Sequence, residues 1–290
     1  MELRGKTGYY LVALFVAFIW SVTFVFTKVL LDDLTPFEIL FYRYVVAYLV
    51  LVVAYPKFEK PKSVKEEIKF ALAGLLGVTL YFLGENYALS YSTASNVALL
   101  VVIAPLITGI FAHFLTKGEP ITRNFAVGGV VAMAGVFLVI FNGHFVLKLH
   151  PIGDMLAIGA AVSFAFYSII LKNMDKSYSA VFITRRSFFY ALLAMVPMLF
   201  TPMFAWKPEV LVRPAIFANL AFLSVIASSL CFMLWNKVIW RLGAVKANNI
   251  LYLVPLMTMI ASAIVLSERI TVFAIAGAVL ILGGVYISQK

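Results

Sequence analysis

Glu85 is the residue with the clearest chemical potential, because it is a carboxylate inside the apolar stretch LYFLGENYALSY. On a helix, Tyr81, Glu85 and Ala88 share one face and Asn86 lies beside them. An ionised carboxylate at the centre of a membrane helix costs at least about 2.5 kcal/mol. Glu85 must therefore face a partner, face a water-filled cavity, or be protonated. It is a candidate for exchanging a proton or pairing with an amine. The alternative is a structural role, pairing with Arg43 or a backbone group.

Amide side chains in apolar stretches form a second set of candidates. They are Asn86, Asn96, Asn236, Asn248 and Asn249, and the spacing of Asn249 and Tyr252 places those two on a shared face. Amides in hydrocarbon need hydrogen-bond partners, so each one either orients a polar ligand or holds helices together. Both interpretations remain open for the group.

Aromatic residues make up 15% of the chain, and six of them fall where a central cavity would have its wall. An aromatic box holds a flat or cationic ligand with up to about 2 kcal/mol per cation–π contact when desolvated. Packing of the helix bundle is the alternative for each ring. The six are Trp20, Tyr81, Phe164, Tyr167, Trp235 and Tyr252.

The elements that must position these residues are membrane helices. The chain is 63% hydrophobic and 12% charged, against roughly 45–50% and 25% in soluble domains, and its mean hydropathy is +1.02. About 20 apolar residues span a bilayer, which predicts an all-α integral membrane protein with about ten spans. We place them near 9–30, 36–55, 67–88, 92–115, 124–141, 152–171, 178–200, 214–236, 245–266 and 270–287.

The chain also repeats itself about 150 positions later. Residues 94–111 match residues 244–261, with Pro105 on Pro255, and the Glu119-x-Ile121-Thr122 motif recurs from Glu268. The same offset places Asn86 on Asn236 but Glu85 on Trp235. The repeat is thus broken at its acidic position, as a site for an asymmetric ligand requires.

Basic residues predict the topology of these two copies. Of the 23 lysines and arginines, Arg43, Arg185 and Arg186 fall inside spans and five lie on the side opposite the N-terminus. The other fifteen lie on the N-terminal side, so both termini are predicted to be cytoplasmic. Five spans per half is an odd number, so residues 1–143 and 144–290 are predicted to be inverted five-helix repeats. Arg43 has a predicted counterpart at Arg185 or Arg186.

Prolines and glycines recur in both copies. Pro105 and Pro255 lie mid-span, where proline kinks a helix, and each kink is either a gating bend or a static feature of packing. Gly128, Gly135, Gly277 and Gly284 allow close helix approach, within the chain or at a dimer contact. We therefore keep a homodimer as one prediction for the partners, beside the lipid bilayer.

The sequence resembles the EamA family of the drug/metabolite transporter superfamily. The resemblance rests on the five-plus-five plan, on Trp20-Ser21 to Lys28, on Arg43, and on the run from AL-x-Y-[ST] to Pro105 with Glu119 closing span four. It implies movement of small metabolites, often amino acids or related compounds, by alternating access through a central cavity.

Other classes of function find less support. The lysines lie in short loops between spans, which argues against a nucleic-acid partner. No histidine has metal-ligand spacing and no nucleotide-binding motif is present, so we predict no metal and no cofactor. We predict a secondary transporter in the cytoplasmic membrane for a small-molecule substrate such as an amino acid or amine, with Glu85 coupling transport to protons. The alternatives are an uncoupled facilitator or channel and, less favoured, an integral-membrane enzyme.

Overall fold

The computed structural model describes residues 5–57, 59–92, 94–141, 150–206, 208–265 and 271–290, and every regular element in those ranges is a helix. Glu268, the predicted boundary at 143/144 and His144 lie outside them. The first half contains α1 (Gly5–Leu30), α2 (Pro36–Ala54), α3 (Val64–Gly74), η1 (Leu75–Leu80), α4 (Tyr81–Tyr91), α5 (Ala94–Val101), α6 (Ala104–Leu115) and α7 (Arg123–Phe141).

The second half continues the all-helical pattern. It contains α8 (Pro151–Lys172), α9 (Ala180–Met195), η2 (Val196–Phe200), α10 (Pro208–Leu211), α11 (Pro214–Ala221), η3 (Phe222–Leu230), α12 (Cys231–Leu242), α13 (Ala244–Asn249), η4 (Ile250–Leu253), α14 (Val254–Val265) and α15 (Val272–Gln289).

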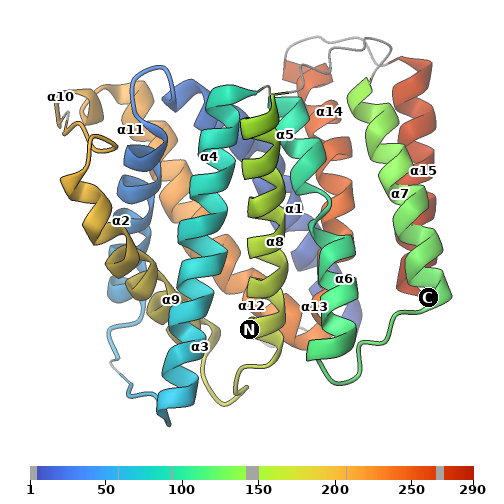
Figure 1. Cartoon of the computed structure of the whole chain (residues 1–290), viewed down its shortest axis with the longest axis horizontal. Helices are drawn as coiled ribbons and strands as arrows, with labels where there is room; N and C mark the ends of the chain where they lie inside the picture. The colour runs from blue at the N-terminus through green and yellow to red at the C-terminus, as the bar shows by residue number, and fades with distance from the viewer. Residues whose placement is uncertain (1–4, 58, 93, 142–149, 207, 266–270) are drawn as a thin grey trace.

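The described helices confirm the predicted plan of about ten spans. Nine continuous apolar helices are long enough to cross a membrane, and the shorter apolar helix 244–260 occupies the predicted ninth position. The spans stand side by side in Figure 1, where α1 begins and α15 ends toward the lower end of the bundle. Helix α1 runs from the lower to the upper end and α8 runs the opposite way, as inverted repeats require. The predicted eighth span is extended to Leu242.

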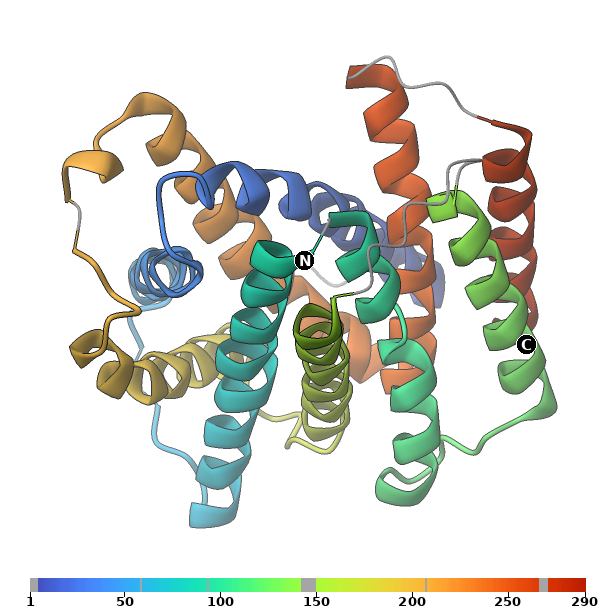
Figure 2. The ribbon, with the colours of Figure 1, turned by 45° about the horizontal axis from the view of Figure 1, so that its top comes forward.

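Helices α7 and α15 form a separate pair at one end of the bundle (Figures 1 and 2). Glycine permits this contact, because a Cβ on Gly128 would lie 2.5 Å from the carbonyl oxygen of Gly284 and one on Gly135 would lie 2.6 Å from that of Gly277. The four glycines therefore serve close packing inside one chain, which is one of the two predicted uses.

The spans that contain Pro105 and Pro255 are both broken just before the proline. Span four stops being α-helical between α5 and α6, at residues 102–103, and Pro105 follows in the first turn of α6. Span nine passes through the tighter 3₁₀ turn η4 before α14, whose second residue is Pro255. A proline nitrogen cannot donate to the carbonyl one turn earlier, so the α-helical ladder must change there. Both prolines thus follow a break in their helical span, and the predicted gating bend stays a prediction.

A second pair of irregularities divides spans three and eight. Both η1 and η3 are π-helical, and they lie at repeat-related positions. A π-helical turn places extra residues in the span and leaves carbonyls without their usual partner. Trp20 of α1 uses one of them, donating from Nε1 to the carbonyl oxygen of Ala227 at 3.0 Å.

Buried Glu38 has a purely structural explanation. It forms a capping box with Thr35 at the start of α2, accepting from the Thr35 amide at 2.9 Å, and its other oxygen accepts from the Ala205 amide at 3.0 Å. Both carboxylate oxygens of Glu38 accept backbone hydrogen bonds at the upper end of the bundle, so we do not count Glu38 as a site residue.

Candidate functional site

A buried cavity lies between the two halves of the chain. Its volume is about 60 Å³, room for a few water molecules and well below the roughly 300–1,000 Å³ of typical ligand pockets. A larger solute therefore requires the walls to move apart. The lining residues are Trp20, Thr23, Phe24, Arg43, Tyr81, Phe82, Glu85, Val101, Val102, Ala104, Phe164, Phe232, Leu251 and Val254.

Most of the apolar wall obeys the internal repeat. Four pairs of lining residues occupy repeat-related positions, one member from each half, so the cavity lies on the pseudo-symmetry axis. The pairs are Trp20 with Phe164, Phe82 with Phe232, Val101 with Leu251, and Ala104 with Val254. The last two pairs lie at the helix breaks of spans four and nine, so both breaks border the cavity.

The polar wall does not obey the repeat. Arg43, Tyr81 and Glu85 all come from the first half. The repeat places Cys231 opposite Tyr81 and Trp235 opposite Glu85, and both second-half residues are fully buried and apolar in character. One face of the cavity is therefore charged and the other is not.

Glu85 is 2% exposed and projects from α4 roughly 9 Å below its upper end, six residues before Tyr91. Tyr81, one turn earlier, interacts with its carboxylate, and Arg43 acts on it electrostatically. Among the described residues, no ion pair within 4.0 Å joins Glu85 to Arg43. The two charges line one cavity without neutralising each other by direct contact.

Arg43 is held from the side. Its Nε donates to Ser228 Oγ of η3 at 2.6 Å, and its guanidinium carbon lies 4.3 Å from the centre of the Phe82 ring. The predicted counterparts in α9 are located elsewhere. Arg185 donates to the backbone of Lys57 at 2.7 Å and Arg186 contacts Glu67, both toward the lower end of the bundle.

The N-caps of α2 and α9, Thr35 and Ser179, give a different alignment of the two helices. Ser187, not an arginine, occupies the position of Arg43. The prediction that Arg43 has an arginine counterpart is wrong, because two arginines near the start of α9 serve its lower-end contacts instead.

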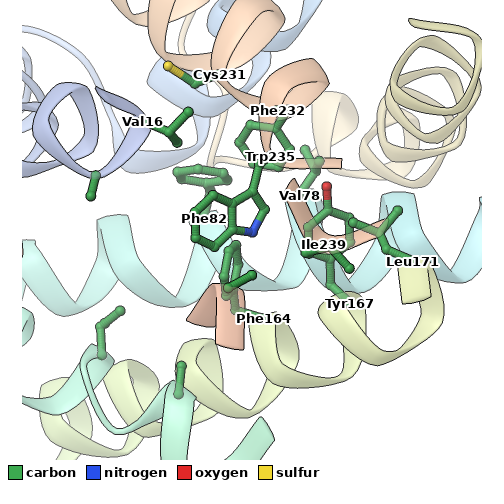
Figure 3. Close-up of a cluster of buried hydrophobic side chains, with 14 of the residues drawn as sticks. Val16, Val78, Phe82, Phe164, Tyr167, Leu171, Cys231, Phe232, Trp235 and Ile239 are labelled. Atoms are coloured by element: carbon green, nitrogen blue, oxygen red, sulfur yellow. The ribbon is translucent and has the colours of Figure 1, made fainter. Parts of the chain in front are cut away.

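Trp235 packs against the cavity wall without lining the cavity. Its ring centre lies 5.1 Å from that of Trp20, and it is fully buried one turn of α12 beyond Phe232. Figure 3 shows the indole surrounded by Phe82, Phe164, Phe232 and Tyr167. Trp20 and Tyr81 line the cavity, whereas Trp235 and Tyr167 lie outside its lining, and a substrate role for all four stays a prediction.

The asparagines hold helices together in most cases. Asn236 accepts from the Tyr167 hydroxyl at 2.9 Å and donates to Thr184 Oγ1 at 2.8 Å. Its repeat partner Asn86 donates to the Pro36 carbonyl at 3.0 Å. Asn86 therefore joins α4 to α2, and Asn236 joins α12 to α9, the second span of its half. Neither lines the cavity.

Two other predicted amides also lie outside the cavity wall. Asn96 donates to Asp154 Oδ1 at 2.7 Å and so ties α5 to α8. Asn248 donates to the Ala244 carbonyl of its own helix at 2.8 Å. A ligand role for Asn96 or Asn248 requires another conformation, in which the amide gives up this hydrogen bond and bonds to the ligand instead.

Asn249 and Tyr252 are fully buried, and neither has a hydrogen-bond partner for its side-chain polar atoms within the described residues. The Tyr252 hydroxyl lies against Gly129 of α7 and Leu106 of α6, away from the cavity lining. Their substrate role remains a prediction.

Some cavity residues were missed at the sequence level. Thr23, Phe24 and Phe232 carried no distinctive pattern, although Phe232 could be found as the repeat partner of Phe82. Arg43 was recognised only as a partner for Glu85. An arginine within an apolar span was a sufficient signal for a site of its own, since such a charge is as costly as a carboxylate.

Glu119, from the first half, caps the start of α13 in the second half. Its Oε1 accepts from the Ala244 amide at 2.7 Å, its Oε2 accepts from the Val245 amide at 3.2 Å, and Lys172 lies 3.6 Å away. Gly243 adopts a positive φ of 96° beside it, and a Cβ there would collide with the carboxylate. The loop after span four therefore caps the start of span nine.

A bundle of about ten apolar helical spans with a charged cavity between its two halves fits a membrane transporter. The model of the EamA-like transporter family matches residues 7–141 and again residues 151–289. The chain belongs to this family.

Relatives of similar length support this class. A protein named uncharacterized transporter from Archaeoglobus fulgidus is 28% identical, with 93% of each chain covered. A probable amino-acid metabolite efflux pump from Escherichia coli is 24% identical, over 95% of this chain and 93% of the other. A crystal structure with 17% identity superimposes with a TM-score of 0.75, covering 98% and 99% of the two chains, and shows the shared fold.

Proposed function

We propose that this protein is a secondary active transporter of small zwitterionic or amine-bearing metabolites, with amino acids favoured. The observation that supports this most directly is the pair of opposite charges, Arg43 and Glu85, which line one cavity without forming an ion pair. Buried charges without a partner are costly. A substrate with an ammonium group for Glu85 offsets part of that cost when it binds.

Alternating access is the mechanism that the helix geometry supports. The cavity lies between the halves, and the breaks of spans four and nine border it on both sides. Discontinuous helices of this kind are found at the substrate sites of inverted-repeat transporters. In this proposal Pro105 and Pro255 allow the two spans to bend, and Trp235 leaves its position against the cavity wall to open the lower route.

Glu85 is the proposed coupling residue. In the ionised form, the Glu85 carboxylate binds an ammonium group. In the protonated form, Glu85 releases this group, and the neutral side chain can lie among apolar residues at lower electrostatic cost. We place the protein in the cytoplasmic membrane with both termini in the cytoplasm, because the basic loops lie on that side. The same arrangement predicts that the lower end in Figure 1 faces the cytoplasm.

Reconstitution into proteoliposomes tests this proposal. Wild-type protein should accumulate a radiolabelled amino acid in response to an imposed pH gradient, and should show counterflow, which separates a carrier from a channel. Glu85→Gln removes the titrating group with little change in shape, so flux should lose its pH dependence while the protein remains folded and monodisperse.

The matched control is Glu59→Gln, an acid in the loop after α2 outside the cavity lining, which should keep wild-type pH dependence. Coupled flux that persists in Glu85→Gln would exclude Glu85 as the coupling residue. Flux without counterflow would exclude the carrier mechanism.

A further inference from the structure

We infer that Arg43 is the substrate's oxyanion site and that it binds a carboxylate through its two terminal nitrogens. This inference rests on the proposed transport function and narrows its substrate class to molecules with a carboxylate. The site is built from α2, α4 and η3, which lie together only in the folded chain.

The guanidinium is fixed before any ligand arrives. Ser228 Oγ accepts from Nε at 2.6 Å and the Phe82 ring lies 4.3 Å from the guanidinium carbon, so both the edge and one face of the group are occupied. Arg43 is 2% exposed and Ser228 is fully buried. A guanidinium held this way loses little further freedom when it binds an anion.

The remaining donors face the cavity. Arginine has five N–H groups, of which Nε uses one. Within the described residues, the two terminal nitrogens have no hydrogen-bond partner from the protein, yet they are not among the side-chain atoms sealed from solvent. They therefore open onto the cavity that Arg43 lines. Two parallel N–H donors match the two oxygens of a carboxylate.

The charge of the cavity favours a carboxylate over a phosphate. Among the described residues that line the cavity, Arg43 is the only cationic one, and Glu85 faces the same space. A phosphate dianion would leave one charge unpaired and lie near the Glu85 carboxylate. A monocarboxylate that also has an ammonium group matches both charges, because Arg43 and Glu85 do not pair with each other.

Ser228 is a positioning residue in this arrangement. It belongs to the π-helical segment η3, whose extra residue brings Ser228 toward α2 while Ser229 donates to the Ala47 carbonyl at 3.1 Å. Ser224 of the same segment is equally buried but donates to the Leu220 carbonyl of its own helix at 2.6 Å. The chain thus offers a matched control on one helical segment.

Binding by the purified, full-length protein in detergent tests the inference with four probes of one shape. L-Phenylalanine has both groups, 3-phenylpropanoate only the carboxylate, 2-phenylethylamine only the amine, and phenyl phosphate the alternative anion. Isothermal titration calorimetry should show the two carboxylates binding the wild type. Arg43→Gln should weaken both by at least about tenfold, because a charge-assisted bidentate contact is lost, and should leave phenylethylamine binding unchanged.

Variants of the positioning residue sharpen the test. Ser228→Ala should weaken carboxylate binding by about threefold to tenfold, Ser228→Thr should restore it, and Ser224→Ala should match the wild type. Arg43→Lys keeps the charge without the planar fork and should recover part of the affinity, which separates recognition from a folding defect.

Three results would overturn the inference: carboxylate binding by Arg43→Gln at wild-type strength, tighter binding of phenyl phosphate than of either carboxylate, or no response of the wild type to any carboxylate. In the proteoliposome assay, transport of phenylethylamine without carboxylate selectivity would refute the Arg43 site and leave the transporter proposal intact. Absence of transport for every amino acid tested there would refute both.

Discussion

The two halves of this chain form opposite faces of one cavity and do different work there. The first half contributes Arg43, Tyr81 and Glu85, and the second contributes only apolar residues to the lining. At the repeat position of Glu85, the second half has Trp235, which is fully buried. The repeat therefore preserves the apolar part of the wall but not its charged part, and we propose that one half recognises charge and the other supplies closure.

The strongest test of this difference between the halves is to substitute the same repeat position in each half. Trp235→Ala should lower the free energy of unfolding by about 3–5 kcal/mol, because a large buried side chain leaves a cavity that neighbours fill only in part. Glu85→Gln should instead leave stability near that of the wild type and remove coupling. Thermal unfolding in detergent and proton-driven flux in liposomes measure the two effects.

Trp206→Ala is the control for the tryptophan, since that ring is exposed at the upper end of the bundle. If Trp235→Ala kept full stability, or if Glu85→Gln unfolded the protein, the division between a closing half and a recognising half would be wrong.

The paired asparagines provide a second comparison with a smaller effect. Asn236→Ala should cost about 1–3 kcal/mol, because it leaves the buried Tyr167 hydroxyl without a partner and removes one of the two hydrogen bonds of Thr184 Oγ1. Asn86→Ala should cost less, since within the described residues its side chain makes a single hydrogen bond, to the Pro36 carbonyl. Chemical denaturation of both variants measures the difference.

The double variant Asn236→Ala, Thr184→Val checks the explanation. Removing both partners of one hydrogen bond should recover part of the loss relative to Asn236→Ala alone. Equal costs for the two asparagines, or no coupling in the double variant, would contradict a structural role for Asn236.

The smallest effect is expected where the halves meet at the lower end in an exposed ion pair. Lys62 Nζ lies 2.7 Å from Asp175 Oδ2, and hydrogen bonding to Lys62 lowers the pKa of Asp175 to about 2. A depressed carboxyl pKa stabilises the fold above the ordinary value near 3.8 and loses this contribution as pH falls toward about 2.

Asp175→Asn should therefore reduce the melting temperature slightly at pH 5, and the difference from wild type should diminish between about pH 4 and pH 2. A large change at pH 5 would show that this contact contributes more to closure of the lower end than an exposed pair normally does. Differential scanning fluorimetry over this pH range is sufficient.

Much of the site was predictable because the cost of burying charge is visible in a sequence. Glu85 stands out in an apolar span, and in the structure it lines one cavity together with Trp20 and Tyr81. The positions of Asn236 and Asn248 were not predictable in this way, since an amide signals only that a partner is needed and not whether that partner is a ligand or a helix. The bonds of Asn236 to Tyr167 and Thr184 depend on how α8, α9 and α12 pack.

The amino-acid sequence by itself determined the helical architecture, the number of spans, the repeat, and the proline breaks, because each follows from local hydrophobicity, length and backbone chemistry. Only the tertiary structure decided that Arg43 donates a hydrogen bond to Ser228 and that Glu119 caps span nine. The same holds for the position of Arg185 and Arg186 away from the cavity. These contacts join residues more than 120 positions apart. Helical spacing defines which residues share a face, but the rotation and depth of each helix in the bundle define what that face meets.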